Sequence, residues 1–163
     1  MSSYPRMKRL FQWKPLVKKG TLPANPSWTR TEQYSGLPSW LLLTHDSKGA
    51  PEALLVDGQE RVESLRLVLD ERLFSDTVMR VVRLSPNMLV AYDLVTLNGS
   101  NFHATHTYAQ RRERIRELLD LFHYPDLVSL IPVEDVPEGT PLRGYEYYDD
   151  KPGSLGTFLP VDE

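Results

Sequence analysis

The chain has 163 residues, of which 40% are hydrophobic and 25% charged, with a net charge of −3 and no cysteine. This length fits one domain with a buried core, and the lack of cysteine excludes disulfides, thiolate zinc sites and cysteine nucleophiles. No apolar run reaches the roughly 18 residues that cross a bilayer, and the first residues do not resemble a signal peptide. We therefore expect a soluble, intracellular protein, cytoplasmic or nuclear, with no membrane partner.

The N-terminal segment is basic and rich in proline and aromatic residues. Residues 1–31 hold seven basic and no acidic residues, whereas residues 32–163 hold twelve basic and 22 acidic ones. Residues 1–39 lack sustained periodicity and are predicted to form an extended arm, with a short helix or strand near residues 8–13. Its cations can contact phosphates and its rings can stack on bases. The alternative is an arm that folds back over its own acidic body.

Two hairpins are predicted between residues 40 and 97. The apolar run 40–44 and the segment 52–56 flank a polar turn that ends in glycine, which is typical of two paired strands. Residues 77–84 and 88–97 are apolar and β-branched, and the Ser-Pro-Asn turn between them favours a second pair.

Two amphipathic helices are predicted from apolar residues that recur every three or four positions. These residues are Val62, Leu65, Leu69 and Leu73 within residues 59–74, and Ile115, Leu118, Leu119 and Phe122 within residues 107–122. Capping-box pairs, Asp57 with Glu60 and Thr107 with Gln110, mark the two starts. Arginines and glutamates alternate on the other faces of the second helix, which predicts a solvated surface there.

Further strands are predicted at residues 127–133, 145–148 and 155–159, the last two on either side of a Pro-Gly turn. The order strands, helix, strands, helix, strands is typical of an α+β fold with antiparallel-rich sheets. We expect one such domain over residues 40–163, preceded by the arm of residues 1–39.

One stretch of the sequence resembles a known family. Residues 88–99 have the sequence Met-Leu-Val-Ala-Tyr-Asp-Leu-Val-Thr-Leu-Asn-Gly, and the pairs Arg111-Arg112 and Leu118-Leu119 follow. An aromatic-Asp strand, an Asn-Gly turn and a helix with paired arginines and leucines resemble motif IIIa of the nucleotidyltransferase fold of DNA ligases and mRNA capping enzymes. The resemblance implies that fold over about residues 40–161, without the OB-type domain that usually follows it.

The resemblance also places the family's nucleophile. The family forms its covalent nucleotide adduct on a lysine that ends a strand ahead of an Asp-Gly pair. That lysine falls on Thr44, followed by Asp46 and by Ser47 in place of the glycine, and Lys48 lies out of register in the turn. A threonine hydroxyl does not replace the lysine amine in this adduct.

Other motifs of the family are also changed. Motif III falls near Asp76, with Thr77 and Val78 in place of glycine and glutamate. The glutamate of motif IV falls on Arg143, whose guanidinium has no acceptor for a metal. The last strand, residues 157–161, has no lysine for motif V.

These substitutions imply a catalytically inactive ligase-like or capping-enzyme-like domain, with no catalytic residue, no metal site and no defined cofactor. The cap-binding domain of snurportin is similar in kind, because it keeps this fold, lacks the lysine and binds a methylated guanosine. We expect a nucleotide, a nucleic-acid end or a protein partner to bind in the same cleft. The expected binding residues are Thr44, His45 and Lys48 at its floor, Arg143 and Tyr145 at its wall, and Trp13, Lys14, Lys18 and Lys19 on the arm.

Two other functions remain open. One is an active enzyme, either a divergent nucleotidyltransferase that uses Lys48 or a two-histidine phosphoesterase. In the latter, His45 and His103, each two positions before a hydroxyl residue, would act as base and acid. The other is a structural subunit of a larger assembly, whose arm docks on a neighbouring protein.

Overall fold

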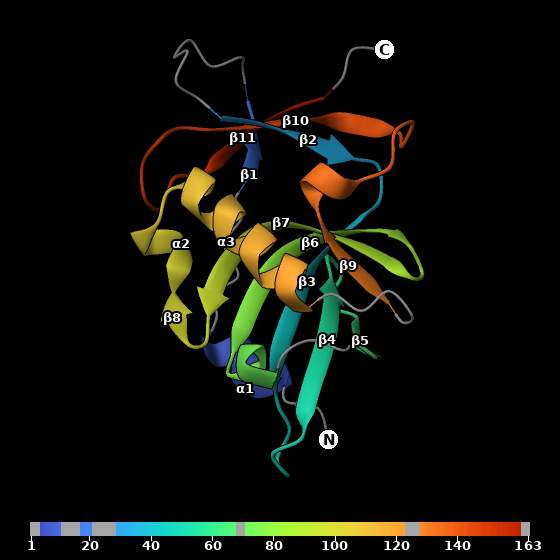
Figure 1. Ribbon diagram of the computed structural model, residues 1–163, viewed down its shortest axis with the longest axis vertical. Coiled ribbons are helices and arrows are strands. Elements are labelled where there is room, and N and C mark those ends of the chain that lie inside the picture. The colour runs from blue at the N-terminus through green and yellow to red at the C-terminus, as the bar shows by residue number, and fades with distance from the viewer. Residues whose placement is uncertain (1–3, 11–16, 21–28, 68–70, 123–127, 161–163) are drawn as a thin grey trace.

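The computed structural model describes residues 4–10, 17–20, 29–67, 71–122 and 128–160. Two β-sheets make up most of this part of the chain, and a few helices pack against them (Figure 1). Figure 1 shows the smaller sheet lying across one end of the larger sheet. The architecture is α+β with mainly antiparallel strands, as the sequence predicts.

The larger sheet has seven strands in the order β5-β4-β3-β6-β7-β8, with β9 beside β7. Its strands are β3 (Leu37–His45), β4 (Pro51–Asp57), β5 (Val62–Leu65), β6 (Thr77–Ser85), β7 (Met88–Leu97), β8 (Ser100–Asn101) and β9 (Ser129–Pro132). Both predicted hairpins are confirmed, since β3 pairs with β4 and β6 pairs with β7, each antiparallel. The carboxylate of Asp46 closes the first turn by accepting the backbone N–H groups of Lys48 (2.8 Å) and Ala50 (3.0 Å).

The larger sheet is buried on both faces, because its central strands are continuous apolar runs. On one face, Leu41 and Leu43 belong to a buried cluster that includes Leu118 of helix α3 (Tyr108–Phe122). On the other face, Leu42 packs in a cluster with Met7 of helix α1 (Tyr4–Leu10), and Met7 is only 1% exposed. The two helices therefore cover opposite faces of the sheet.

The smaller sheet has four strands in the order β1-β11-β10-β2. They are β1 (Val17–Lys19), β2 (Thr29–Tyr34), β10 (Leu142–Tyr148) and β11 (Gly156–Pro160). β10 pairs antiparallel with both β11 and β2, which confirms the predicted pairing of the last two strands, and β1 runs parallel to β11. The sheet thus combines strands from residues 17–34 and 142–160, drawn in blue and in orange to red in Figure 1.

Helix α3 begins at the predicted capping box. The backbone N–H of Thr107 donates to the Gln110 side chain (2.9 Å), and the backbone N–H of Gln110 donates to the Thr107 hydroxyl (3.2 Å). The remaining helical elements are α2 (Phe102–Thr105) and the 3-10 turns η1 (Glu71–Phe74) and η2 (Val133–Asp135). Of the helices in the described ranges, none combines the length and apolar character that crossing a membrane requires.

The helix predicted over residues 59–74 is wrong. The strand β5 and the turn η1 lie in this stretch instead, and residues 68–70 of the prediction are outside the described residues. Asp57 caps a turn rather than a helix, because its carboxylate accepts the backbone N–H groups of Gln59 (2.9 Å) and Arg61 (3.0 Å), and Glu60 in that turn has a φ of 59°. The chain then runs back along β4, where backbone pairing satisfies its polar groups, and this pairing outweighs the helical spacing of the apolar residues.

The N-terminal segment contains more regular structure than the predicted extended arm. The elements α1, β1 and β2 lie within residues 1–39, and the expected boundary at its end falls inside β3. Arg6 and Lys8 of α1 form ion pairs with Asp76 and Glu60, with nitrogen–oxygen distances of 2.9 and 2.5 Å. For these two cations, the alternative in which the segment folds back over acidic residues of the same chain is confirmed.

Candidate functional site

The residues expected to bind a ligand fall into two groups that lie far apart. Thr44 and His45 end β3 and Lys48 follows in the turn, whereas Arg143 and Tyr145 lie in β10 and Lys18 and Lys19 lie in β1. Figure 1 shows the β3–β4 turn at the end of the larger sheet that points away from the smaller sheet. The two groups therefore do not meet in one site. Trp13 and Lys14 lie outside the described residues.

The position expected for the family's lysine is occupied by a closed polar contact. Thr44 is fully buried, and its hydroxyl donates to Oδ1 of Asp76 (2.6 Å). Arg6 of α1 reaches the same point, where it donates to the Thr44 hydroxyl and to both Asp76 carboxylate oxygens (2.9 and 3.0 Å). The hydrogen bond from Arg6 lowers the pKa of Asp76, and that from Thr44 lowers it further. No amine is present at this contact, and an arginine guanidinium remains protonated.

The two histidines of the phosphoesterase alternative lie on elements of different kinds. His45 ends a strand, whereas His103 lies in α2, so they do not form the paired-strand arrangement of that hypothesis. Lys48 is exposed in the hairpin turn. Within the described ranges, no group of three or more His, Asp or Glu side chains is placed to hold a metal ion.

A buried polar network, which the sequence analysis missed, joins the two sheets. Glu146 of β10 is fully buried and accepts hydrogen bonds from Gln33 of β2, from both terminal nitrogens of Arg80 of β6, and from the Tyr148 hydroxyl (2.7 Å). Arg80 also donates to the Tyr148 hydroxyl (2.9 Å). The signal in the sequence is the spacing of two residues that places side chains on one face of a strand, since Gly144, Glu146 and Tyr148 are the buried positions of β10.

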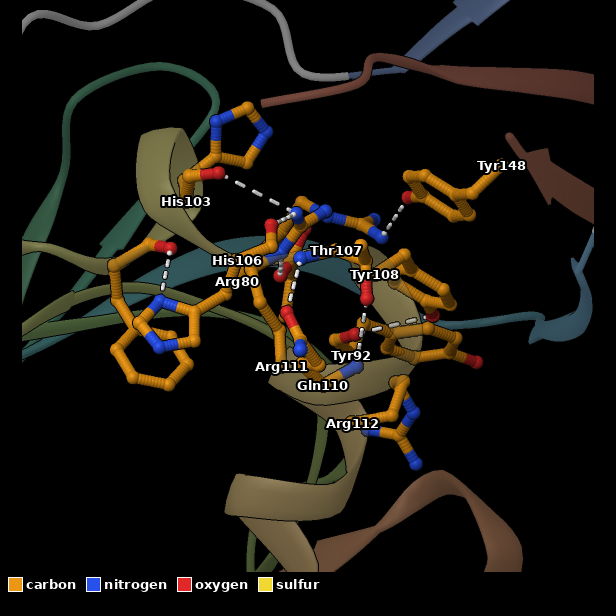
Figure 2. A network of polar contacts seen from close by, with 12 residues as sticks. Arg80, Tyr92, His103, His106, Thr107, Tyr108, Gln110, Arg111, Arg112 and Tyr148 are labelled. Atoms are coloured by element: carbon orange, nitrogen blue, oxygen red, sulfur yellow. Dashed lines mark hydrogen bonds and ion pairs between the residues drawn. The ribbon is translucent and has the colours of Figure 1, made fainter. Parts of the chain in front are cut away.

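Tyrosine rings extend this network toward α3 (Figure 2). The ring of Tyr148 stacks on that of Tyr108, with a centroid distance of 3.6 Å and an interplanar angle of 7°. The Tyr108 hydroxyl donates to the Tyr92 carbonyl (3.2 Å), and the Tyr92 hydroxyl accepts the backbone N–H of Tyr34 (2.8 Å). Burial raises the pKa of both Tyr108 and Tyr148, so these phenols stay protonated and can donate. Packed protein groups thus occupy this part of the interface between the sheets.

The aromatic-Asp strand and the paired arginines of the sequence pattern are in contact. Arg111 donates to both carboxylate oxygens of Asp93 (2.6 and 3.2 Å), and both side chains are 0% exposed. Arg112 is also buried, at 6% exposure. The predicted solvated face is therefore wrong for Arg111 and Arg112, whereas Arg114 and Arg116 farther along α3 are exposed. In this fold the aspartate and the first arginine form a buried ion pair.

The environment of His103 can be tested through the pH dependence of the protein's stability. Burial lowers the pKa of His103, and the Arg111 cation lowers it further, while Asp93 partly opposes the shift. The folded state then binds a proton less readily than the unfolded state, whose histidine pKa is about 6.5. This contribution to stability is present above that value and is lost as the pH falls below it.

We expect the free energy of unfolding to fall between about pH 7 and pH 5, and to fall less steeply in a His103→Gln variant. Urea titrations of both proteins across this range measure the difference between the two slopes. Equal slopes would show that His103 titrates alike in the folded and unfolded states.

The second group of expected residues lies on the smaller sheet. We define its outer face by four of the residues of β2 and β10 that alternate with the buried positions, namely Arg30, Glu32, Tyr145 and Tyr147. In the register, Tyr145 lies opposite Glu32 and Tyr147 opposite Arg30. The guanidinium of Arg30 lies 4.7 Å from the centroid of the Tyr145 ring, and its nearest nitrogen is 3.8 Å from the Glu32 carboxylate. Both tyrosines are half-buried.

The smaller sheet carries further cations, and they are not all on this face. Arg143 and Lys19 are exposed on the same sheet, and the Arg143 guanidinium lies 5.5 Å from the centroid of the Phe158 ring. Lys19 pairs with Phe158, the partner of the buried Glu146, so it lies on the opposite side of the sheet from Tyr147. The backbone of Lys18 pairs with Thr157, the partner of Tyr147. The four strands carry four basic residues against two acidic ones, and one of the acids, Glu146, is buried and paired with Arg80. The sheet is therefore locally basic in a chain whose net charge is −3.

Comparison with known proteins adds no family to these observations, because no family model and no curated protein matches the chain.

Proposed function

We propose that this chain is a non-catalytic domain of nucleotidyltransferase-like fold that binds nucleic acid through the outer face of its smaller sheet. The observation that carries this proposal is the combination of two tyrosine rings, Tyr145 and Tyr147, with the cation Arg30 on one sheet face. Aromatic rings that can stack on bases and cations that can contact phosphates are the two groups that nucleic-acid surfaces combine. Arg143 is a second exposed cation on β10, the strand that carries the two rings, and it favours the same ligand.

The contact at Thr44 supports the non-catalytic part of the proposal. Covalent nucleotidyl transfer needs an amine at this position, and Arg6, Thr44 and Asp76 fill it with a guanidinium, a hydroxyl and a carboxylate that bind one another. Incubation of the folded protein with α-labelled ATP or GTP and magnesium or manganese should give no labelled band on a denaturing gel. A band that disappears in a Lys48→Ala variant would favour the divergent transferase instead.

Binding is tested by the anisotropy of a labelled oligonucleotide at several salt concentrations. We expect the affinity to fall as salt rises, because each phosphate contact releases counterions. A double variant, Arg30→Gln and Arg143→Gln, should reduce the magnitude of the slope of log K against log salt by about 1.4, at about 0.7 for each contact on a single strand. Arg66→Gln is the matched control, since Arg66 is an exposed arginine after β5 in the other sheet.

The alternative functions predict other outcomes. A structural subunit that docks on a neighbouring protein should show no salt-dependent binding, and the double variant should then equal Arg66→Gln. An equal loss for each charge removed in the double variant and in Arg66→Gln would mean that binding depends on overall charge rather than on this sheet. Either result would contradict the proposed surface.

A further inference from the structure

We infer that the outer face of the smaller sheet takes unpaired bases of a single strand in preference to a duplex, with Tyr145 and Tyr147 as two stacking positions. This inference rests on the proposed binding of nucleic acid and names the form of the ligand. It depends on the spacing of the two rings, on the shape of the surface and on the charges beside the rings.

The spacing of the rings fits separated bases. Tyr145 and Tyr147 stand two residues apart in one strand, so both belong to the same face of the sheet, about 6.6 Å apart along β10. Neighbouring bases in a duplex are stacked about 3.4 Å apart along the helix, and their faces cover one another. Two bases that each stack on one of these rings must be unstacked from each other, which a single strand permits.

Among the described residues of this sheet, no helix or isolated two-stranded ribbon is present to enter a duplex groove. Recognition of base edges in the major groove uses a helix or a two-stranded ribbon that fits into it. Here both rings belong to β10, an inner strand of a four-stranded sheet, since β10 lies between β11 and β2. A sheet face that carries aromatic rings can bind splayed bases by their faces, and every base has such a face, so we expect little sequence preference.

Arg30 lies beside the tyrosine rings and can also contact a phosphate, so it connects base stacking with phosphate binding. Its guanidinium lies over the Tyr145 ring at 4.7 Å, and its backbone lies opposite Tyr147. A base that stacks on Tyr145 takes the space above the ring, and Arg30 then moves to a neighbouring phosphate. Arg30→Gln should therefore reduce the dependence of the affinity on salt concentration, and the preference for single strands should remain.

The negative charge of Glu32 opposes the binding of phosphates, so a variant without this charge should bind nucleic acid more tightly. Its carboxylate is opposite Tyr145 in the register and 3.8 Å from Arg30 at the nearest approach. A strand bound across this face brings phosphates toward a negative charge that Arg30 only partly offsets. Glu32→Gln should therefore tighten binding several-fold, a result that damage to the fold does not produce.

The test is a competition assay on the full chain, in which a labelled oligothymidine is displaced by three unlabelled competitors. These are the same strand, a duplex of the same length and an abasic strand that keeps only the sugar-phosphate backbone. We expect the single strand to compete at least tenfold better than the other two. Tyr145→Leu and Tyr147→Leu should each reduce its affinity about tenfold, whereas the Phe variants keep the ring and the affinity.

The outcomes separate this inference from the proposed function. If the duplex and the abasic strand compete as well as the single strand, and the Leu variants equal the Phe variants, the inference is wrong and phosphate binding alone remains. If no competitor displaces the probe because the protein binds none of them, the proposed function is wrong as well. Thermal unfolding of each Leu variant, compared with its Phe partner, shows whether a loss of binding reflects a loss of fold.

Discussion

Asp93→Ala should lower the free energy of unfolding by about 3–5 kcal/mol, because it leaves the Arg111 guanidinium buried without its carboxylate. Both side chains are 0% exposed, and the two hydrogen bonds between them connect α3 to β7. Urea denaturation followed by circular dichroism measures the change. We expect a lower midpoint with an unchanged slope, since the surface exposed on unfolding stays the same.

Two controls separate the effect of burial from that of losing any ion pair. Arg114 and Glu117 form an exposed pair on the same helix (2.9 Å), and Arg114→Ala should cost no more than about 0.5 kcal/mol. The double change Asp93→Leu with Arg111→Met removes both buried charges and should recover much of the stability. A loss in Asp93→Ala no larger than that in Arg114→Ala would contradict the role given to the buried pair.

Glu146→Leu should have an effect of similar size, about 3–5 kcal/mol, and should act mainly on the contact between the two sheets. The carboxylate of Glu146 accepts hydrogen bonds from Gln33, Arg80 and Tyr148, and Arg80 is the one donor that belongs to the larger sheet. Without the carboxylate, the Arg80 guanidinium, whose side chain is 12% exposed, loses its only ion pair among the described residues.

Hydrogen exchange locates this second effect. We expect the amides of β1, β2, β10 and β11 to lose protection by more than those of β3, β4, β6 and β7, because the smaller sheet loses its polar link. Tyr147→Phe, on the opposite face of β10, is the matched control and should change stability by less than about 0.5 kcal/mol. Equal loss of protection in both sheets would show that the network stabilises the fold as a whole rather than this contact.

Much of the larger sheet could be predicted from the sequence, because its hairpins combine apolar runs with polar turns. The smaller sheet was harder to predict on its N-terminal side. In β2 the buried positions include Thr31 and Gln33, so polar residues point inward and the usual alternation of apolar and polar residues is absent. Gln33 tolerates burial because Glu146, from the other end of the chain, accepts its hydrogen bond.

At the contact around Thr44, too, local sequence patterns predict only part of the structure. The position of Thr44 at the end of its strand could be predicted, since local pattern sets the strand and its turn. The hydrogen bond from Arg6 to Thr44 could not be predicted, because it joins residues 38 positions apart and depends on how α1 packs. The pairing of Arg80 with Glu146 spans 66 positions and likewise has no local signal. Contacts of this kind follow from the tertiary fold rather than from any segment.

The composition of the smaller sheet has a consequence for the order of folding. Its four strands come from residues 17–34 and 142–160. The N-terminal strands therefore pair with strands that are separated from them by more than a hundred residues of chain. Contacts of such long range form slowly, because the entropy of loop closure must be overcome first. During synthesis β3 to β9 emerge before β10, and until then Arg80 lacks its carboxylate partner. The docking of β10 is therefore the step that adds a C-terminal strand to β2 and gives the buried Arg80 of the larger sheet its carboxylate partner.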